Sequence, residues 1–159
     1  MADEKKPGEA RHHVFHPEPA HFNVSPAGFQ IWAKQYYQCR LLFEYEGFSP
    51  VPYFLLCRAI ELFFKSVHLE TREQRLVKEA YWHDLVKSYN DLPPDEKILS
   101  AEQLLLLEEA NQIYNNEKGF EYFNLYHAVR GHTEYPDLKA LDELAAHIAG
   151  RMGQRPMKD

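Results

Sequence analysis

The sequence predicts a single all-α domain, and three observations support that prediction. The chain has 159 residues, a length at which one domain with one core is usual. Apolar residues recur at helical spacing in several segments, and most of these segments follow a helix-start signal. No segment alternates Val, Ile or Thr with polar residues as a half-buried strand does. We therefore expect a soluble helical domain over residues 22–152, with an arm at 1–21 before it and a tail at 153–159 after it.

The N-terminal arm lacks the apolar groups that a core segment needs. Val14 and Phe15 are its larger apolar residues, among Lys, Glu, Gly, three prolines and four histidines. Such a segment cannot offset the entropy lost on ordering, so we predict that residues 1–21 are flexible. The histidines would suit a metal site if the arm were helical, but Pro17 and Pro19 disfavour a helix, and no metal or cofactor is expected.

The first predicted helix begins at Ser25-Pro26, where a cap residue precedes the proline that suits the first helical position. Apolar residues then supply a broad surface, and we expect this helix to continue to about Glu46, before Gly47.

The central helix is the strongest prediction of the sequence. Ser49-Pro50 repeats the start signal, and residues 53–67 (YFLLCRAIELFFKSV) form a run that is too long for a typical strand. The run is apolar nearly all round except for a narrow charged stripe. We therefore predict a buried helix over residues 50–69.

Three further helices follow along the chain. Thr71–Gln74 has the form of a capping box and predicts a short helix to about Ala80. Ser100–Gln103 has the same form and predicts a helix that ends at the Asn- and Gly-containing break of residues 115–119. Residues 136–152 have the periodicity of an amphipathic helix.

Another short helix is predicted to begin at His83 or Asp84 and to end at Leu92, before Pro93-Pro94. A helix start offers backbone N–H groups and a favourable dipole to an anion, and His83 is a residue that titrates near neutral pH. The alternative is that His83 or Asp84 caps the helix, and this is the preferred interpretation.

Residues 120–135 combine dense aromatic side chains with Arg130 and His132 and show no clear periodicity. Such a segment can stack a base or pack against a partner, and it can also plug the open side of a short bundle. Aromatic residues are enriched at interfaces, so this segment is also the predicted homodimer contact.

Composition excludes several classes of protein. The two cysteines, Cys39 and Cys57, lie within predicted helices and lack zinc-ligand spacing, which fits core thiols in a reduced, cytoplasmic compartment. No apolar run is long enough to span a membrane, so no membrane association is expected. The net charge of −6 and the pI near 5.8 argue against a large phosphate-binding surface but leave room for a local basic patch.

The charged stripe of the central helix has two interpretations. Four residues fall within an arc of roughly 80° on an ideal helix: Arg58, Glu61, Lys65 and His68. In the first interpretation this arc is the solvated edge of a buried helix. In the second it is a ligand-facing slot, where Glu61 neutralises one of the two cations and leaves the other available to an anion or a phosphate.

Two short motifs resemble those of the HEPN superfamily. One is the run Ala59–Ser66 (AIELFFKS), and the other is His83-Asp84-Leu85 at the start of a later short helix. Residues 119–123 and 128–131 also resemble small bacterial HEPN-like proteins, and the likeness covers roughly residues 26–150. The resemblance implies a small antiparallel, up-and-down bundle of four to five main helices, often dimeric. Members of the HEPN superfamily include ribonuclease toxins, partners of small nucleotidyltransferases and nucleotide-binding modules.

The resemblance implies a binding function rather than catalysis. Active HEPN ribonucleases carry an Arg and a His separated by four to six residues, whereas Arg130 and His132 have one residue between them. We therefore expect a non-catalytic binding or partner module, and the expected partners are a second copy of the chain, a nucleotidyltransferase, or a nucleotide or RNA. One alternative is a metal-independent ribonuclease that uses Arg130 and His132, and another is a structural oligomer. The candidate binding residues are Arg58, Glu61, Lys65, His83, Asp84 and Arg130.

Overall fold

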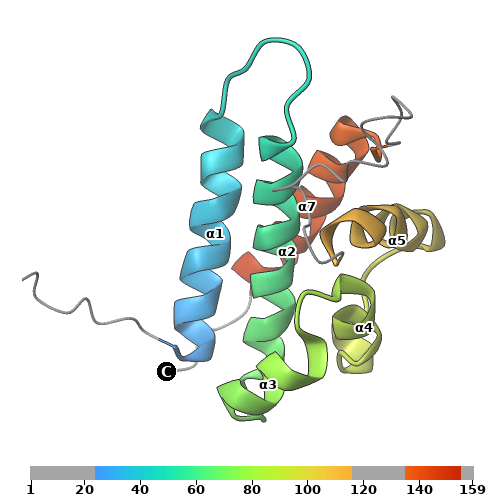
Figure 1. Ribbon diagram of the computed structural model, residues 1–159. Helices are drawn as coiled ribbons and strands as arrows, with labels where there is room; N and C mark the ends of the chain where they lie inside the picture. Colours follow the sequence, from blue (N-terminus) through green and yellow to red (C-terminus); the bar gives the residue numbers. More distant parts are fainter. Residues whose placement is uncertain (1–23, 116–134, 155–159) are drawn as a thin grey trace, which may run out of the picture.

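The computed structural model describes residues 24–115 and 135–154, and within these ranges the chain forms helices and no strand. The predicted all-α class is therefore confirmed. Figure 1 shows α1 and α2 side by side and antiparallel. Helix α7 lies behind α2, and α4 and α5 lie on the side of α2 away from α1. The elements are α1 (Pro26–Leu42), α2 (Val51–His68), α3 (Gln74–Tyr81), α4 (Leu85–Asn90), the 3₁₀ helix η1 (Pro94–Glu96), α5 (Ala101–Tyr114) and α7 (Leu138–Gly153).

Several helix starts use the cap residues that the sequence predicts. The Ser25 hydroxyl accepts a hydrogen bond from the backbone N–H of Gly28 at 3.2 Å. Ser100 and Gln103 form both hydrogen bonds of the capping box at α5. Each of these bonds satisfies a backbone N–H that has no partner within its own helix. The predicted arm at 1–21 and most of the predicted tail lie outside the described residues.

The first helix is shorter than predicted, because it ends at Leu42 rather than near Glu46. Phe43 leaves the helical conformation, with φ −81° and ψ 109°. The side chains of Leu41 and Leu42 are 61% and 82% exposed, so apolar residues at the end of α1 find no core to pack against. Because most helix stability in proteins comes from packing, an apolar pattern without a facing surface does not extend the helix.

The predicted capping box at Thr71 is wrong. The backbone N–H groups of Thr71 and Arg72 both donate to the carbonyl of His68, at 3.2 and 3.0 Å, so these residues still close the end of α2. Helix α3 starts only at Gln74, and its N-cap residue, Glu73, makes no capping side-chain hydrogen bond.

The core is built around α2, as the sequence predicts. Helices α1, α4, α5 and α7 all contact it, and an ion pair of 2.6 Å between Arg40 and Asp142 joins α1 to α7. The buried apolar side chains of α2 cover most of its circumference apart from the charged stripe: Tyr53, Leu56, Cys57, Ala59, Ile60, Leu62, Phe63, Phe64 and Val67. No helix of the described ranges is long and apolar enough to cross a membrane.

A buried histidine attaches the C-terminal end of α2 to the segment from α3 to α4. The His68 ring stacks on Tyr81, with centroids 4.2 Å apart, and its Nε2 lies 2.9 Å from the carbonyl oxygen of Ser88. A carbonyl can only accept, so Nε2 carries a proton and donates it. Burial lowers the pKa of His68 below its ordinary value of 6.5, and the charge of Arg72 lowers it further.

Because of His68, we expect the stability of the fold to decrease in acid. The unfolded chain binds a proton at His68 more readily than the folded chain, so the free energy of unfolding should fall as the pH drops below 6.5. His68→Gln, which keeps an N–H donor but does not titrate, should reduce that slope in urea titrations between pH 7.5 and 5. An unchanged slope would contradict the assignment, and His147→Gln, at an exposed histidine, is the control.

Candidate functional site

The charged stripe of α2 is buried, which excludes the interpretation of a solvated edge. Glu61 is 1% exposed, Lys65 8% and His68 3%, while the side chain of Arg58 is 30% exposed. A buried ion must be paired and hydrogen-bonded, because the loss of hydration is otherwise too costly. The partners of Glu61 therefore define the site.

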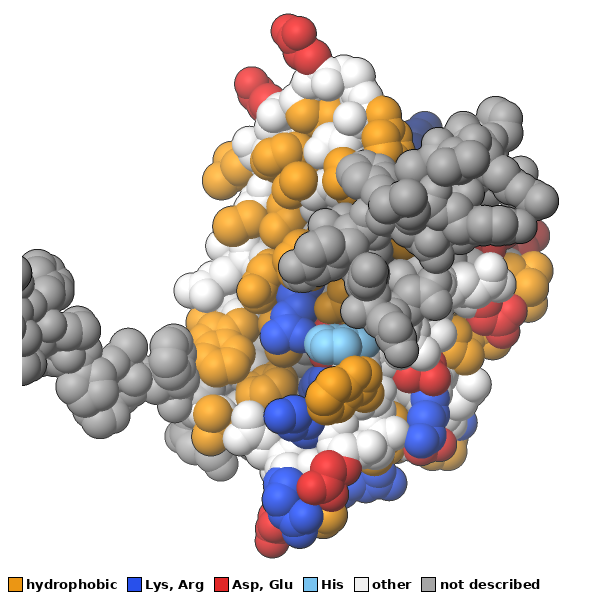
Figure 2. All heavy atoms as spheres, viewed as in Figure 1, with side chains coloured by type: hydrophobic (Ala, Val, Ile, Leu, Met, Phe, Trp, Pro, Cys, Tyr) orange, Lys and Arg blue, Asp and Glu red, His pale blue; other side chains and the backbone are white. Residues whose placement is uncertain are grey.

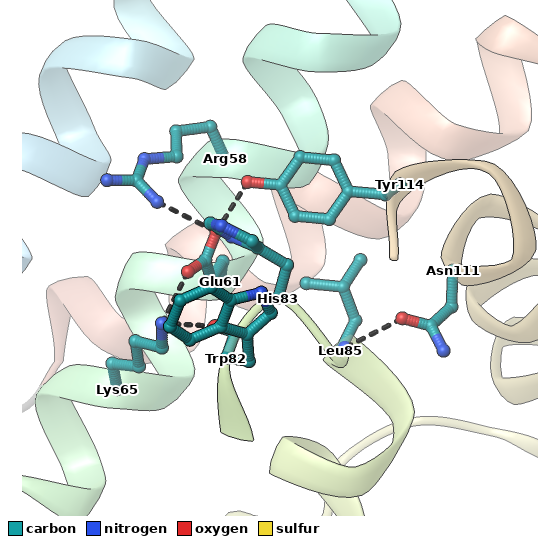
Figure 3. A network of polar contacts seen from close by, with 8 residues as sticks. All are labelled: Arg58, Glu61, Lys65, Trp82, His83, Leu85, Asn111 and Tyr114. Atoms are coloured by element: carbon teal, nitrogen blue, oxygen red, sulfur yellow. Dashed lines mark hydrogen bonds and ion pairs between the residues drawn. The ribbon is translucent and has the colours of Figure 1, made fainter. Parts of the chain in front are cut away.

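Four side chains donate to the Glu61 carboxylate or lie against it (Figure 3). Lys65 Nζ lies 2.5 Å from Oε1, and Arg58 Nη1 donates to Oε2 at 2.9 Å. The Tyr114 hydroxyl of α5 donates to the same Oε2 atom, and His83 Nδ1 is 3.3 Å from it. Residues from α2, α5 and the corner between α3 and α4 thus meet at one carboxylate.

The carboxylate of Glu61 is ionised at neutral pH. Burial raises its pKa, but the hydrogen bond from His83 and the charges of Lys65 and Arg58 outweigh burial and lower the pKa to about 2. Burial and the charge of Glu61 raise the pKa of Tyr114, so its hydroxyl keeps its proton and donates it. Because an ionised carboxylate only accepts, Nδ1 of His83 carries a proton and donates to Glu61.

The site has an excess of positive charge. Glu61 can neutralise one of its two cationic neighbours, Arg58 and Lys65, and the exposed Lys78 of α3 adds a third cation nearby. The Lys, Arg and Glu side chains that line the cavity are thus three cations and one carboxylate, which is a net charge of +2.

These groups line a cavity of about 260 Å³ between α1, α2 and the corner that follows α3. Figure 2 shows Lys and Arg side chains around a histidine on this face, next to apolar side chains. The walls combine aromatic and cationic groups: Phe29, Trp32, Arg58, Glu61, Leu62, Lys65, Leu69, Gln74, Val77, Lys78, Trp82 and His83.

Trp82 lies at the rim of this cavity on a strained backbone. Its φ of 47° is in the region that favours glycine, and no other non-glycine residue of the described ranges has a positive φ. Lys65 Nζ donates to the Trp82 carbonyl at 2.5 Å, which holds the corner against α2. Backbone strain of this kind persists where the surrounding structure over-determines it, and functional sites are where such strain clusters.

Asp84 is a helix cap and not part of an anion site. Its Oδ1 accepts from the backbone N–H of Lys87 at 2.9 Å and from the side chain of Asn111 at 3.1 Å. The N–H of Leu85 donates to Asn111 Oδ1 at 2.8 Å, so two backbone N–H groups at the start of α4 have side-chain partners. Two other predicted residues, Arg130 and His132, lie outside the described residues.

The structure thus brings together four of the predicted binding residues: Arg58, Glu61, Lys65 and His83. Sequence reasoning missed Tyr114, Lys78 and Trp82 as members of this group. No local pattern signals that the Tyr114 hydroxyl reaches a carboxylate 53 positions away in the chain. Trp82 does carry a signal, because it directly precedes His83 in the motif that supports the resemblance.

Comparisons of this chain with models of protein families, with curated proteins and with solved structures find no significant match. Within the described ranges, His, Cys, Asp and Glu do not gather in groups of three that could hold a metal ion.

Replacing Glu61 should test whether its carboxylate holds the site together. Glu61→Gln leaves Lys65 and Arg58 without a counter-charge, and we expect a loss of about 3 kcal/mol in the free energy of unfolding. The matched control is Glu79→Gln, which removes another pair at i,i+4 spacing, Arg75–Glu79, whose side chains are 70% and 58% exposed. That pair should contribute at most about 0.5 kcal/mol. Equal losses for both variants in urea titrations at pH 7 would show that burial of Glu61 does not matter.

Replacing Trp82 should separate its backbone strain from its side chain. Trp82→Gly and Trp82→Ala remove the same indole, but glycine adopts the positive φ without steric cost. We expect the glycine variant to be more stable than the alanine variant by about 1 kcal/mol, measured by thermal and urea unfolding. A more stable alanine variant would contradict the strain.

Proposed function

We propose that this protein is a nucleotide-binding module and that the cavity beside Glu61 is its binding site. The observation that supports the proposal best is the buried Glu61 carboxylate, which organises the cations of the cavity without neutralising all of them. A site with a net charge of +2 and aromatic walls suits a ligand that carries both a phosphate and a ring.

The cations have donors to spare for a phosphate. Glu61 and the Trp82 carbonyl use two of the three N–H groups of Lys65. Glu61 accepts from one nitrogen of Arg58, whose planar guanidinium has five donors and matches phosphate geometry. Lys78 reaches the same cavity from α3. Charge-assisted hydrogen bonds to a phosphate are stronger than neutral ones, so these three residues are the proposed phosphate site.

The remaining walls suit a nucleoside. Phe29, Trp32 and Trp82 provide apolar and aromatic surface, on which a base can stack. His83 is 46% exposed at its side chain, and its Nε2 is an acceptor when the ring is neutral. A ribose hydroxyl is a donor of the kind that this nitrogen requires.

We also propose that this protein is a non-catalytic helical bundle related to HEPN proteins. The pairing of Glu61 with both Lys65 and His83 supports this relationship. Glu61 and Lys65 belong to the first motif of the resemblance, and His83 belongs to the second. A homodimer and a nucleotidyltransferase partner are part of the same proposal and follow from the resemblance alone.

Calorimetric titration with adenosine monophosphate (AMP) tests the proposed function. We expect saturable binding that weakens as salt is raised, because the phosphate is held by charge. Lys78→Ala should lower the affinity about fivefold or more, since a charge-assisted hydrogen bond contributes roughly 1.5–3 kcal/mol. Lys78 is exposed, so its loss should not unfold the protein.

The matched control is Lys139→Ala, which removes an exposed lysine from α7, away from the cavity. This variant should bind AMP as the parent protein does. Absence of AMP binding at low salt, or equal effects of the two lysine variants, would contradict the proposed function.

A further inference from the structure

The indole of Trp82 is placed at the cavity at a cost to the protein. Trp82 is 60% exposed, so burial of this large apolar side chain does not explain where it lies. Its backbone is strained, with φ 47° and ψ −110°. Burial of the indole therefore does not account for the surface position of Trp82.

Several contacts determine where the indole lies. Lys65 fixes the Trp82 carbonyl, and Lys78 Nζ lies 5.7 Å from the centroid of the indole ring. The His83 ring meets the indole edge-on, at a centroid distance of 5.8 Å and an interplanar angle of 63°. Figure 3 shows Trp82 and His83 together beside the Glu61–Lys65 pair. Among the described residues, no aromatic ring stacks face to face on the indole, and the group that lies over its face is the mobile side-chain end of the exposed Lys78.

The volume of the cavity limits the size of its occupant. At about 260 Å³ it is smaller than the roughly 300–1,000 Å³ of pockets that take drug-sized ligands. A cavity of this size has no room for more than one nucleotide unit. Lys65 bonds directly to the backbone of Trp82, so the cationic and aromatic walls of the cavity lie close together.

We propose that Trp82 is the specificity-determining residue of the site, and that it stacks on the base of a nucleoside monophosphate whose phosphate lies at Arg58, Lys65 and Lys78. This inference rests on the proposed nucleotide-binding function and adds the ligand class and the residue that recognises the base. The strained corner holds the indole over the phosphate site, so base and phosphate are bound together rather than by separate surfaces.

Tryptophan fluorescence provides a direct test, because the two tryptophans of the chain, Trp32 and Trp82, both line the cavity. In Trp32→Phe protein the signal comes from Trp82 alone. AMP should quench this signal saturably, as a base stacked on an indole does. Ribose 5-phosphate, which has the phosphate and the sugar but no base, should bind about tenfold more weakly and cause little quenching.

Trp82→Gly removes the indole and tolerates the positive φ, so it is the variant for the calorimetric comparison. It should lower the affinity for AMP about tenfold and leave the affinity for ribose 5-phosphate unchanged. Trp82→Phe retains an aromatic face and should keep most of the affinity for AMP. If the glycine variant does not fold, the comparison of AMP with ribose 5-phosphate in Trp32→Phe protein decides the question by itself.

Two negative outcomes are distinguishable. Equal binding of AMP and ribose 5-phosphate, with no quenching of Trp82, would overturn the role of Trp82 while phosphate binding at the three cations stands. Binding of neither ligand to the parent protein would overturn the proposed function and this inference together.

Discussion

Glu61 places an ionised carboxylate inside the core, and the packing around α2 follows from that charge. A charge in the middle of the most apolar helix must be met by donors from every side, because its hydration is lost. Lys65 and Arg58 come from the same helix, but Tyr114 and His83 must be brought from distant parts of the chain. The packing of α5 and of the corner between α3 and α4 against α2 thus satisfies a requirement that Glu61 creates.

The same network explains why the corner can be strained. Trp82 adopts its positive φ while its carbonyl is held by Lys65, and the next residue, His83, is held by Glu61. His68 of α2 packs on Tyr81, the residue before Trp82, and bonds to Ser88 in α4. These contacts with α2 fix the corner and hold the indole of Trp82 at the cavity. A buried ion pair contributes little net stability compared with apolar packing, so its value in this protein lies in positioning.

The Glu61–Lys65 pair shows how burial changes the meaning of a common pattern. At i,i+4 spacing on an exposed helix it would contribute a few tenths of a kcal/mol, as the Arg75–Glu79 pair of α3 does by its exposure. In α2 the pair lies beneath a cavity, and its lysine also fixes a neighbouring backbone. Spacing alone could not distinguish these two cases, since both pairs look alike in the sequence.

The sequence by itself determined the all-α class, the buried central helix and most helix starts, because these depend on local patterns of apolar residues and on caps such as Ser25 and Ser100. It also identified Arg58, Glu61, Lys65 and His83 as candidates, without showing that they meet. Only the tertiary structure decided where α1 ends and where α3 begins. The end of α1 depends on whether a facing surface is present, and the start of α3 depends on the closing turn of α2. Only the tertiary structure placed Tyr114, Lys78 and Trp82 at the site, because contacts between residues far apart in the chain follow from packing and not from spacing.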